Sequence, residues 1–325
     1  MQKKSLKHYI YDLTHLRRDN KYGGAPHKPI LLLSIIENVE SGNILDNKIF
    51  ILPELVSVFK KLWSTLVTSN RHHCIFTLPF YHLRTESFWN LVANIGFENV
   101  IQSKIVMKSF SNLNLAVRYA EIDIELFNFM KSKKEREILK FALLDKYFPE
   151  SKNNLLSNNN ENYLTKIESE FLNESSAEYR LRLQSLKEQL IKEEFEEERF
   201  LRSNVFKRQV PIIYKNTCAI SGLQINATIN ISLVDACHIV PFSNTFDDSI
   251  ANGISLTPTL HRAFDRGLIS IDENYKVLIS NKFIESQSSQ FSIKQFEGKQ
   301  ILLPDNKKYY PNIENLIWHR NNIFK

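Results

Sequence analysis

Cysteines, long apolar runs and an apolar leader are scarce or absent in this chain of 325 residues. The three cysteines, Cys74, Cys218 and Cys237, are too few and too scattered for a disulfide framework. The longest apolar run, residues 30–36, is far shorter than the roughly 20 residues that span a bilayer. The first twelve residues are too polar and charged for a secretory signal. We therefore expect a cytoplasmic protein with no membrane association.

The composition is that of a folded protein, with 43% hydrophobic and 24% charged residues. The length is enough for two domains of ordinary size. The net charge of +6 is uneven: residues 1–149 carry +7, residues 150–204 carry −4 and residues 205–325 carry +3. Two basic ends around an acidic middle are compatible with a polyanionic partner, although many basic proteins bind no nucleic acid.

Local composition divides the chain into three segments. Residues 1–150 look mixed but mainly helical, with helices expected over 28–40, 53–66, 121–130 and 133–147, and a short one from about Glu86. Residues 151–204 begin with a Ser- and Asn-rich linker and continue as a helical, Glu-rich connector. We interpret that connector as a solvated helix; the alternative is an acidic segment that repels DNA. Residues 205–325 carry short β-type segments before a helix at 259–265.

The chemistry-bearing residues lie in a predicted strand–strand–helix unit of the third segment. His238 lies on the first strand, Asn252 begins the second, and His261 lies on the helix. A histidine with a pKa near 6.5 can take a proton from water, and a divalent cation can stabilise charge on a phosphodiester. Asp235 and His261 offer oxygen and nitrogen ligands for that cation.

The run DACHIVP, NGISL and LHRAFDRG at 235–267 resembles the HNH nuclease motif, the ββα-metal fold. The resemblance covers about residues 205–325. It implies His238 as general base, Asn252 as the middle residue, and Asp235 and His261 as metal ligands. It also implies one Mg²⁺ or Mn²⁺ per site, and products with 5′-phosphate and 3′-hydroxyl ends.

The chain departs from the family pattern in two respects. Many ββα-metal nucleases have a metal ligand directly before the base histidine, and this chain has Cys237 at that position. Cys237 is either a small buried side chain or a metal ligand. Asp235 lies three positions before His238, so a regular strand directs the two to opposite faces, and Asp235 needs a bend to reach the metal. Asp265, one turn after His261, either pairs with nearby arginines or orients His261. No structural zinc is expected, because the segment has two cysteines and no CxxC.

The first segment is similar to the sulfur-binding domain that precedes HNH domains in phosphorothioate-dependent restriction endonucleases. The similarity rests on residues 25–33, 78–84, 88–89 and 147–149. Apolar and aromatic groups beside cations suit a poorly hydrated sulfur flanked by phosphates. The alternatives are that Pro79, Phe80 and Trp89 belong to the core, which we expect for Trp89, and that Lys28 is a solvated helix-start lysine. The candidate DNA-binding residues are Lys28, Arg71, His72, Pro79, Phe80, Tyr81, His82, Arg84, Tyr147, Phe148 and Pro149.

The sequence thus predicts an α+β protein with a mainly helical DNA-recognition domain at 1–150, a linker and connector at 151–204, and a ββα-metal HNH domain at 205–325. The predicted function is a restriction endonuclease acting on double-stranded, phosphorothioated DNA, compatible with a homodimer. One alternative is an HNH nuclease that reads plain sequence or a modified base. The other is a DNA-binding protein with an inert HNH scaffold, which the intact His238, Asn252 and His261 disfavour.

Overall fold

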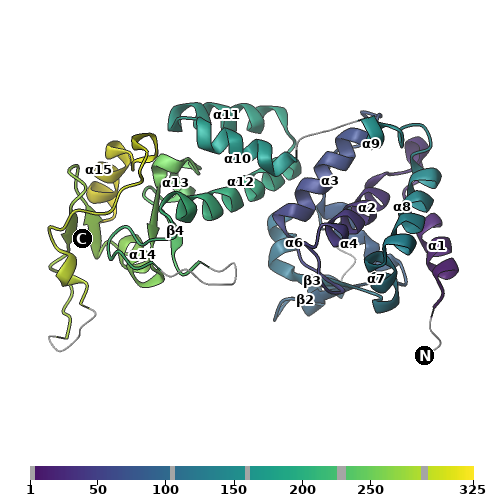
Figure 1. The fold of residues 1–325 in the computed structure, drawn as a ribbon, viewed down its shortest axis with the longest axis horizontal. Helices are drawn as coiled ribbons and strands as arrows, with labels where there is room; N and C mark the ends of the chain where they lie inside the picture. The colour runs from purple at the N-terminus through teal and green to yellow at the C-terminus, as the bar shows by residue number, and fades with distance from the viewer. Residues whose placement is uncertain (1–3, 103–106, 158–161, 225–231, 287–291) are drawn as a thin grey trace. The chain divides into compact units, whose positions relative to one another are not determined.

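A computed structural model describes residues 4–102, 107–157, 162–224, 232–286 and 292–325 (Figure 1). They form two compact units: Met1–Lys166 with Lys187–Leu201, and Ile167–Leu186 with Arg202–Lys325. The first unit is mainly helical, and the second contains a strand–strand–helix arrangement, so the expected α+β class is confirmed. None of the described helices is long and apolar enough to cross a membrane.

The first unit packs helices around α2 and beside a small antiparallel sheet of order β1–β3–β2. Almost every side chain of α2 is buried, in keeping with the apolar run at residues 30–36 in its middle. Its helices are α1 (Leu6–Thr14), α2 (His27–Glu40), α3 (Pro53–Leu66), α4 (Thr77–His82), α5 (Glu98–Gln102), α6 (Phe110–Ala116), α7 (Ile124–Lys131), α8 (Lys133–Tyr147) and α9 (Asn154–Ser157). Its strands are β1 (Lys48–Ile49), β2 (Trp89–Ala93) and β3 (Val117–Ile122), and its 3₁₀ turns are η1 (Lys21–Gly23) and η2 (Leu83–Thr85).

The predicted helices over 53–66 and 133–147 are confirmed at both ends. The helix expected from about Glu86 is wrong, because the segment from Trp89 forms β2 and pairs with β3. The helix expected over 121–130 begins later, at Ile124, because β3 continues to Ile122. In both places an apolar segment with ambiguous periodicity takes the sheet pairing that tertiary contacts offer.

Three helices follow: α10 (Tyr163–Asn173), α11 (Ser176–Gln189) and α12 (Lys192–Ile213). The expectation of a solvated acidic connector is wrong for the first half of α12. Glu197 is 0% exposed and accepts the Phe76 backbone N–H at 2.7 Å, while Glu196 accepts the Ser111 N–H at 3.3 Å. These carboxylates therefore satisfy free N–H groups at the starts of α4 and α6, where the helix dipole favours negative charge. Burial raises the pKa of Glu197 to about 8.

The second unit contains the expected strand–strand–helix arrangement. Strand β4 (Asp235–His238) pairs antiparallel with β5 (Gly253–Leu256), and α14 (Pro258–Asp265) follows. The strand expected over 229–239 is observed only as β4, and residues 225–231 lie outside the described residues. The other elements are α13 (Phe242–Thr245), η3 (Ile250–Asn252), β6 (Ile269–Ile271), β7 (Val277–Ile279), η4 (Lys294–Phe296), η5 (Lys307–Tyr309) and α15 (Ile313–Asn322).

The turn after α14 depends on Gly267, which has a positive φ of 69°. A Cβ at this position would lie 1.9 Å from the Ile323 carbonyl oxygen. We expect Gly267→Ala to lower the thermal unfolding temperature of the second unit strongly. Gly298→Ala is the matched control, because Gly298 has a φ of 70° and nothing within 4 Å of the added Cβ. It should cost only the left-handed backbone strain of about 1–2 kcal/mol. Equal destabilisation in calorimetry would show that the contact with Ile323 is unimportant.

Candidate functional site

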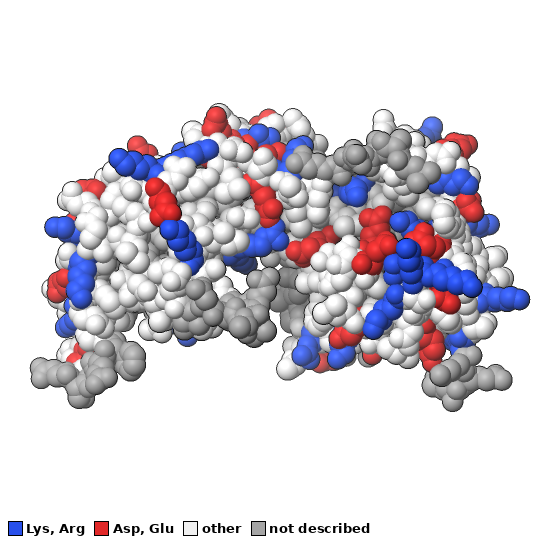
Figure 2. Space-filling view, viewed as in Figure 1, with Lys and Arg blue, Asp and Glu red and all other residues white. Residues whose placement is uncertain are grey.

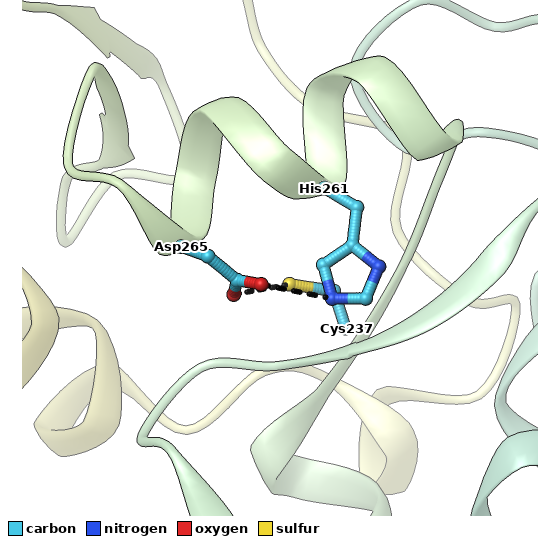
Figure 3. Close-up of side chains that lie close together, drawn as sticks. All are labelled: Cys237, His261 and Asp265. Atoms are coloured by element: carbon cyan, nitrogen blue, oxygen red, sulfur yellow. Dashed lines mark hydrogen bonds and ion pairs between the residues drawn. The ribbon is translucent and has the colours of Figure 1, made fainter. Parts of the chain in front are cut away.

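Three potential metal ligands converge between β4 and the last turn of α14 (Figure 3). One donor atom each from Cys237, His261 and Asp265 lies within 4.8 Å of the other two. The His261 Nε2 atom is 3.4 Å from Asp265 Oδ2, because residues four apart share a helix face. Burial, and then the neighbouring Asp265, raises the pKa of the Cys237 thiol. A cation that binds Cys237 must therefore displace its proton, as thiolate ligation requires.

Asp235 lies outside this cluster but contacts the same histidine. Its Oδ2 atom is 3.3 Å from His261 Nδ1, the ring nitrogen opposite the one that faces Asp265. Asp235 and Cys237 are two positions apart on a regularly paired strand, so both face α14 without the bend that the sequence appeared to require. A carboxylate on Nδ1 leaves the lone pair of Nε2 for a metal ion.

The His238 side chain projects from the face of β4 opposite to the one that carries Asp235 and Cys237. Its ring stacks on Phe206 with centroids 4.0 Å apart, and its Nε2 lies 2.8 Å from Asp248 Oδ1. The side chain is 20% exposed, so solvent can reach it. In the described part of the chain, no hydrogen bond joins the His238 side chain to the metal-ligand cluster. The cluster and His238 are joined through the backbone of β4, because Cys237 and His238 are consecutive residues, whose Cα atoms are about 3.8 Å apart.

Asn252 is wholly buried, so in this arrangement it cannot touch a substrate or a metal ion. Its amide exchanges hydrogen bonds with the Val240 backbone at 2.9 and 3.0 Å and donates to the Asp247 carbonyl at 2.8 Å. Asn315 donates to its carbonyl oxygen at 3.0 Å. The side chain thereby ties the loop after β4 to the start of β5. In this arrangement Asn252 has structural contacts and does not act directly on a substrate or a metal ion.

Residues 218–272 match the family model HNH_2, described as HNH endonuclease. This segment is an HNH endonuclease domain. It contains β4, β5 and α14. No curated protein matches the chain. Among solved structures, the chain is similar to a protein titled "Modification dependent TagI restriction endonuclease", with 18% identity and a TM-score of 0.26. That match covers 36% of this chain and only 37% of the other.

A buried histidine outside the matched segment packs against α14. His319 on α15 bonds to Ser270 Oγ at 2.9 Å and to the Phe264 carbonyl at 3.1 Å, and its ring stacks on Phe264 at 3.7 Å. Burial lowers the pKa of His319 to about 4, so the ring is neutral at pH 7. The contact fixes the C-terminal end of α14, where Asp265 follows Phe264.

The first unit contains a pocket of about 560 Å³ that combines cationic, imidazole and apolar groups. Four of the predicted DNA-binding residues, Lys28, His72, Pro79 and His82, line it. The other lining residues, which the sequence reasoning missed, are Arg17, Arg18, Asp19, Ala25, His27, Leu78 and Thr85. The adjacent pair Arg17-Arg18, close to the basic start of the chain, was the available signal for a cationic rim.

The pocket is less charged than its residue types suggest. Lys28 forms an ion pair with Glu86 at 2.5 Å, and burial lowers its pKa. Burial also lowers the pKa of His27, to about 4, and that of His82. These two imidazoles are therefore neutral at pH 7. With Lys28 paired to Glu86, the remaining charged residues of the lining are Arg17, Arg18 and Asp19, and Arg18 stacks over the Tyr147 ring at 4.3 Å.

The remaining predicted DNA-binding residues do not line the pocket. Phe80 and Tyr81 are 0% exposed and belong to the core, which removes them from the proposed contacts. Arg84 stacks on Tyr81 at 3.9 Å and bonds to the Ile101 carbonyl. Arg71 is exposed, 5.0 Å from the Tyr22 ring. At the end of α8, the Tyr147 ring lies against the Arg18 guanidinium. The next two residues differ in exposure, because Phe148 is buried and Pro149 is exposed.

Basic and acidic side chains are interspersed on the face of the molecule shown in Figure 2. The overall positive charge therefore does not form one continuous basic surface on that face. A DNA interface is better argued from the pocket and the HNH domain than from net charge.

Proposed function

We propose that this nuclease is a restriction endonuclease that hydrolyses double-stranded DNA carrying a backbone phosphorothioate. The HNH domain cuts the DNA, and the pocket of the first unit reads the modification. The convergence of Cys237, His261 and Asp265, with His238 the next residue of β4 after Cys237, supports the first part of the proposal. The mixture of arginines with apolar and neutral groups in the pocket supports the second part.

In the proposed reaction, His238 is the general base. Asp248 accepts a hydrogen bond from Nε2–H, which leaves the Nδ1 lone pair to take a proton from water. The water oxygen forms a bond to phosphorus while the bond from phosphorus to the 3′ oxygen breaks. The leaving 3′ oxygen takes a proton from solvent. The products have 5′-phosphate and 3′-hydroxyl ends.

Cys237, His261 and Asp265 are the residues that would hold the divalent ion, and Asp235 would orient His261. A sulfur, a nitrogen and an oxygen donor fit Zn²⁺ better than Mg²⁺ or Mn²⁺, which prefer oxygen ligands. When bound, such an ion stabilises negative charge on the phosphoryl and leaving oxygens. Asp265 thus replaces Asp235 as the proposed carboxylate ligand.

The pocket suits a phosphorothioate because it offers two kinds of contact. Leu78, Pro79 and Ala25 supply apolar surface for a large, weakly hydrated sulfur. Arg17 and Arg18 can donate hydrogen bonds to the neighbouring phosphate oxygens. The neutral His27 and His82 add polarity without the strong hydration of a cation.

Binding of matched duplexes, with and without one phosphorothioate, tests this reading. We expect the full-length His238→Ala chain to prefer the modified duplex, and the ratio of the two affinities to persist as salt is raised, because salt acts on the phosphate contacts that both duplexes share. Leu78→Ala should reduce the ratio by about fourfold for each methylene group removed from contact. Fluorescence anisotropy across a salt series measures both quantities.

Substitutions of two exposed arginines, one in the pocket and one outside it, distinguish phosphate contacts from sulfur recognition. Arg17→Ala should weaken binding of both duplexes and reduce the salt slope by about 1. Arg118→Ala is the control, because Arg118 is an exposed arginine of β3 outside the pocket. Equal affinity of the two duplexes at every salt concentration would overturn the sulfur reading. It would leave a nuclease directed by base sequence or base modification.

A further inference from the structure

Two side chains outside the His–Asn–His motif hold the ring of His238 from different directions. Phe206, in the second half of α12, lies parallel to the ring with an interplanar angle of 6° and a centroid separation of 4.0 Å. Asp248, in the loop before β5, bonds to the ring edge at 2.8 Å. Both partners are buried, with Phe206 0% and Asp248 1% exposed. Only His238 itself reaches solvent among the three.

The contact with Asp248 selects one tautomer of His238. A carboxylate only accepts hydrogen bonds, so Nε2 carries the proton and Nδ1 keeps its lone pair. Burial raises the pKa of Asp248, and the hydrogen bond from His238 opposes that rise. The other carboxylate oxygen, Oδ2, is buried and has no hydrogen-bond partner in the described residues. Among those residues the bond to His238 is therefore the only side-chain hydrogen bond that Asp248 makes.

The contact with Phe206 depends on a glycine in the partner strand. Gly253 is the β5 residue paired with His238. A Cβ at Gly253 would lie 2.9 Å from Phe206 Cε2 and 2.7 Å from Val210 Cγ2. Its φ is not in the left-handed region, so backbone conformation does not require glycine there. The absent side chain is what allows α12 to bring the Phe206 ring over His238.

We propose that Asp248 and Phe206 are positioning residues for DNA hydrolysis, which fix the tautomer and the ring plane of His238. This inference rests on the proposed role of His238 as general base. A base that swings or exchanges tautomers spends less time with its lone pair aimed at water, and small misplacements reduce rates strongly. Losing either contact should therefore slow hydrolysis at saturating DNA without changing DNA affinity.

Asp248→Asn tests whether the carboxylate selects the tautomer of His238, because the substitution hardly changes the shape of the side chain at position 248. An amide can donate to Nε2 and so reverse the tautomer, and we expect the single-turnover rate at saturation to fall about 10²-fold or more. The Kd for the duplex should stay within twofold. Asp247→Asn is the matched control, because Asp247 is similarly buried and adjacent in sequence, and its side chain accepts the Ser249 N–H with no hydrogen bond to His238 among the described residues. It should cut at nearly the wild-type rate.

Phe206→Leu tests whether stacking on Phe206 fixes the plane of the His238 ring, and Phe171→Leu is its control. Phe171 is a buried phenylalanine that packs edge-on against Phe206, with centroids 6.3 Å apart. Both variants remove similar apolar contact and should lose similar thermal stability. Only Phe206→Leu should also lower the saturated rate. Equal rates for the two variants would show that Phe206 merely packs.

Nitrogen-15 spectra of the imidazole rings, assigned with His238→Asn, give a readout independent of activity. The wild-type chain should show His238 as the Nε2–H tautomer, and Asp248→Asn should shift that population. An Nδ1–H tautomer in the wild type, or an Asp248→Asn chain with an unchanged rate, would overturn the positioning role. If His238→Ala itself cut normally, the base assignment would fail too, which separates the two failures.

Discussion

Replacing His238 with alanine is expected to slow cleavage by about 10²–10⁴-fold, the usual effect of removing a general base. The affinity for duplex DNA should stay within a few-fold of wild type, because the side chain is only 20% exposed and packs against Phe206, Phe242 and Asp248. Single-turnover cleavage and equilibrium binding on the same duplex measure both effects.

A matched control uses another histidine paired with a carboxylate. His8 lies 3.3 Å from Asp12 on α1 and is about half exposed. His8→Ala should leave the cleavage rate unchanged. If His238→Ala cut within a few-fold of wild type, His238 would be a structural histidine and the base would have to be sought elsewhere in the HNH domain.

Metal dependence is the second large effect. A chelator should abolish cutting, and Zn²⁺ should restore it at lower concentration than Mg²⁺ or Mn²⁺, because Cys237 and His261 are soft or borderline ligands. Cys237→Ser should weaken Zn²⁺ binding by at least about tenfold, the lower limit seen even for groups outside the ligand set. It should affect Mg²⁺ much less. Equilibrium dialysis of the metal-stripped chain measures binding without relying on activity.

Cys218→Ser controls for the loss of a buried thiol in the same domain. Cys218 Sγ accepts the Ser221 N–H at 3.4 Å and is not part of the cluster. Asp235→Asn distinguishes the orienting role from ligation, since it should weaken metal binding less than Asp265→Asn does. An unchanged ion preference in Cys237→Ser would show that Cys237 only packs against α14.

The HNH domain was the most predictable part of the molecule from sequence. The spacing of His238, Asn252 and His261 placed two strands and a helix correctly, because local patterns determine those elements. Which residue has which role in the site was harder to predict from the sequence. Asp265 lies one turn from His261 on a helix that was predicted, but only the packing of α14 on β4 shows that Asp265 faces Cys237. The burial of Asn252 depends on contacts with a distant loop and with α15.

The errors elsewhere have a common origin in long-range contacts. The acidic start of α12 looks solvated in sequence because its partners, such as Lys60 and the Phe76 backbone, lie more than 100 residues away. The Lys187–Leu201 segment belongs to the first compact unit, so a fragment ending at residue 150 would lack it, and binding is best measured on the full chain. The cytoplasmic location, the homodimer and the domain boundaries at 150 and 204 stay predictions.

Cleavage of two matched duplexes, one with a single phosphorothioate and one without, tests the central proposal most directly. The wild-type chain is incubated with each duplex over a series of Zn²⁺, Mn²⁺ and Mg²⁺ concentrations, and the product ends are identified. We predict cutting of the modified duplex only, with 5′-phosphate and 3′-hydroxyl ends and with His238→Ala inactive. Equal cutting of both duplexes would contradict modification-dependent recognition while leaving the HNH chemistry intact. No cutting of either duplex with any of the ions would contradict the whole account.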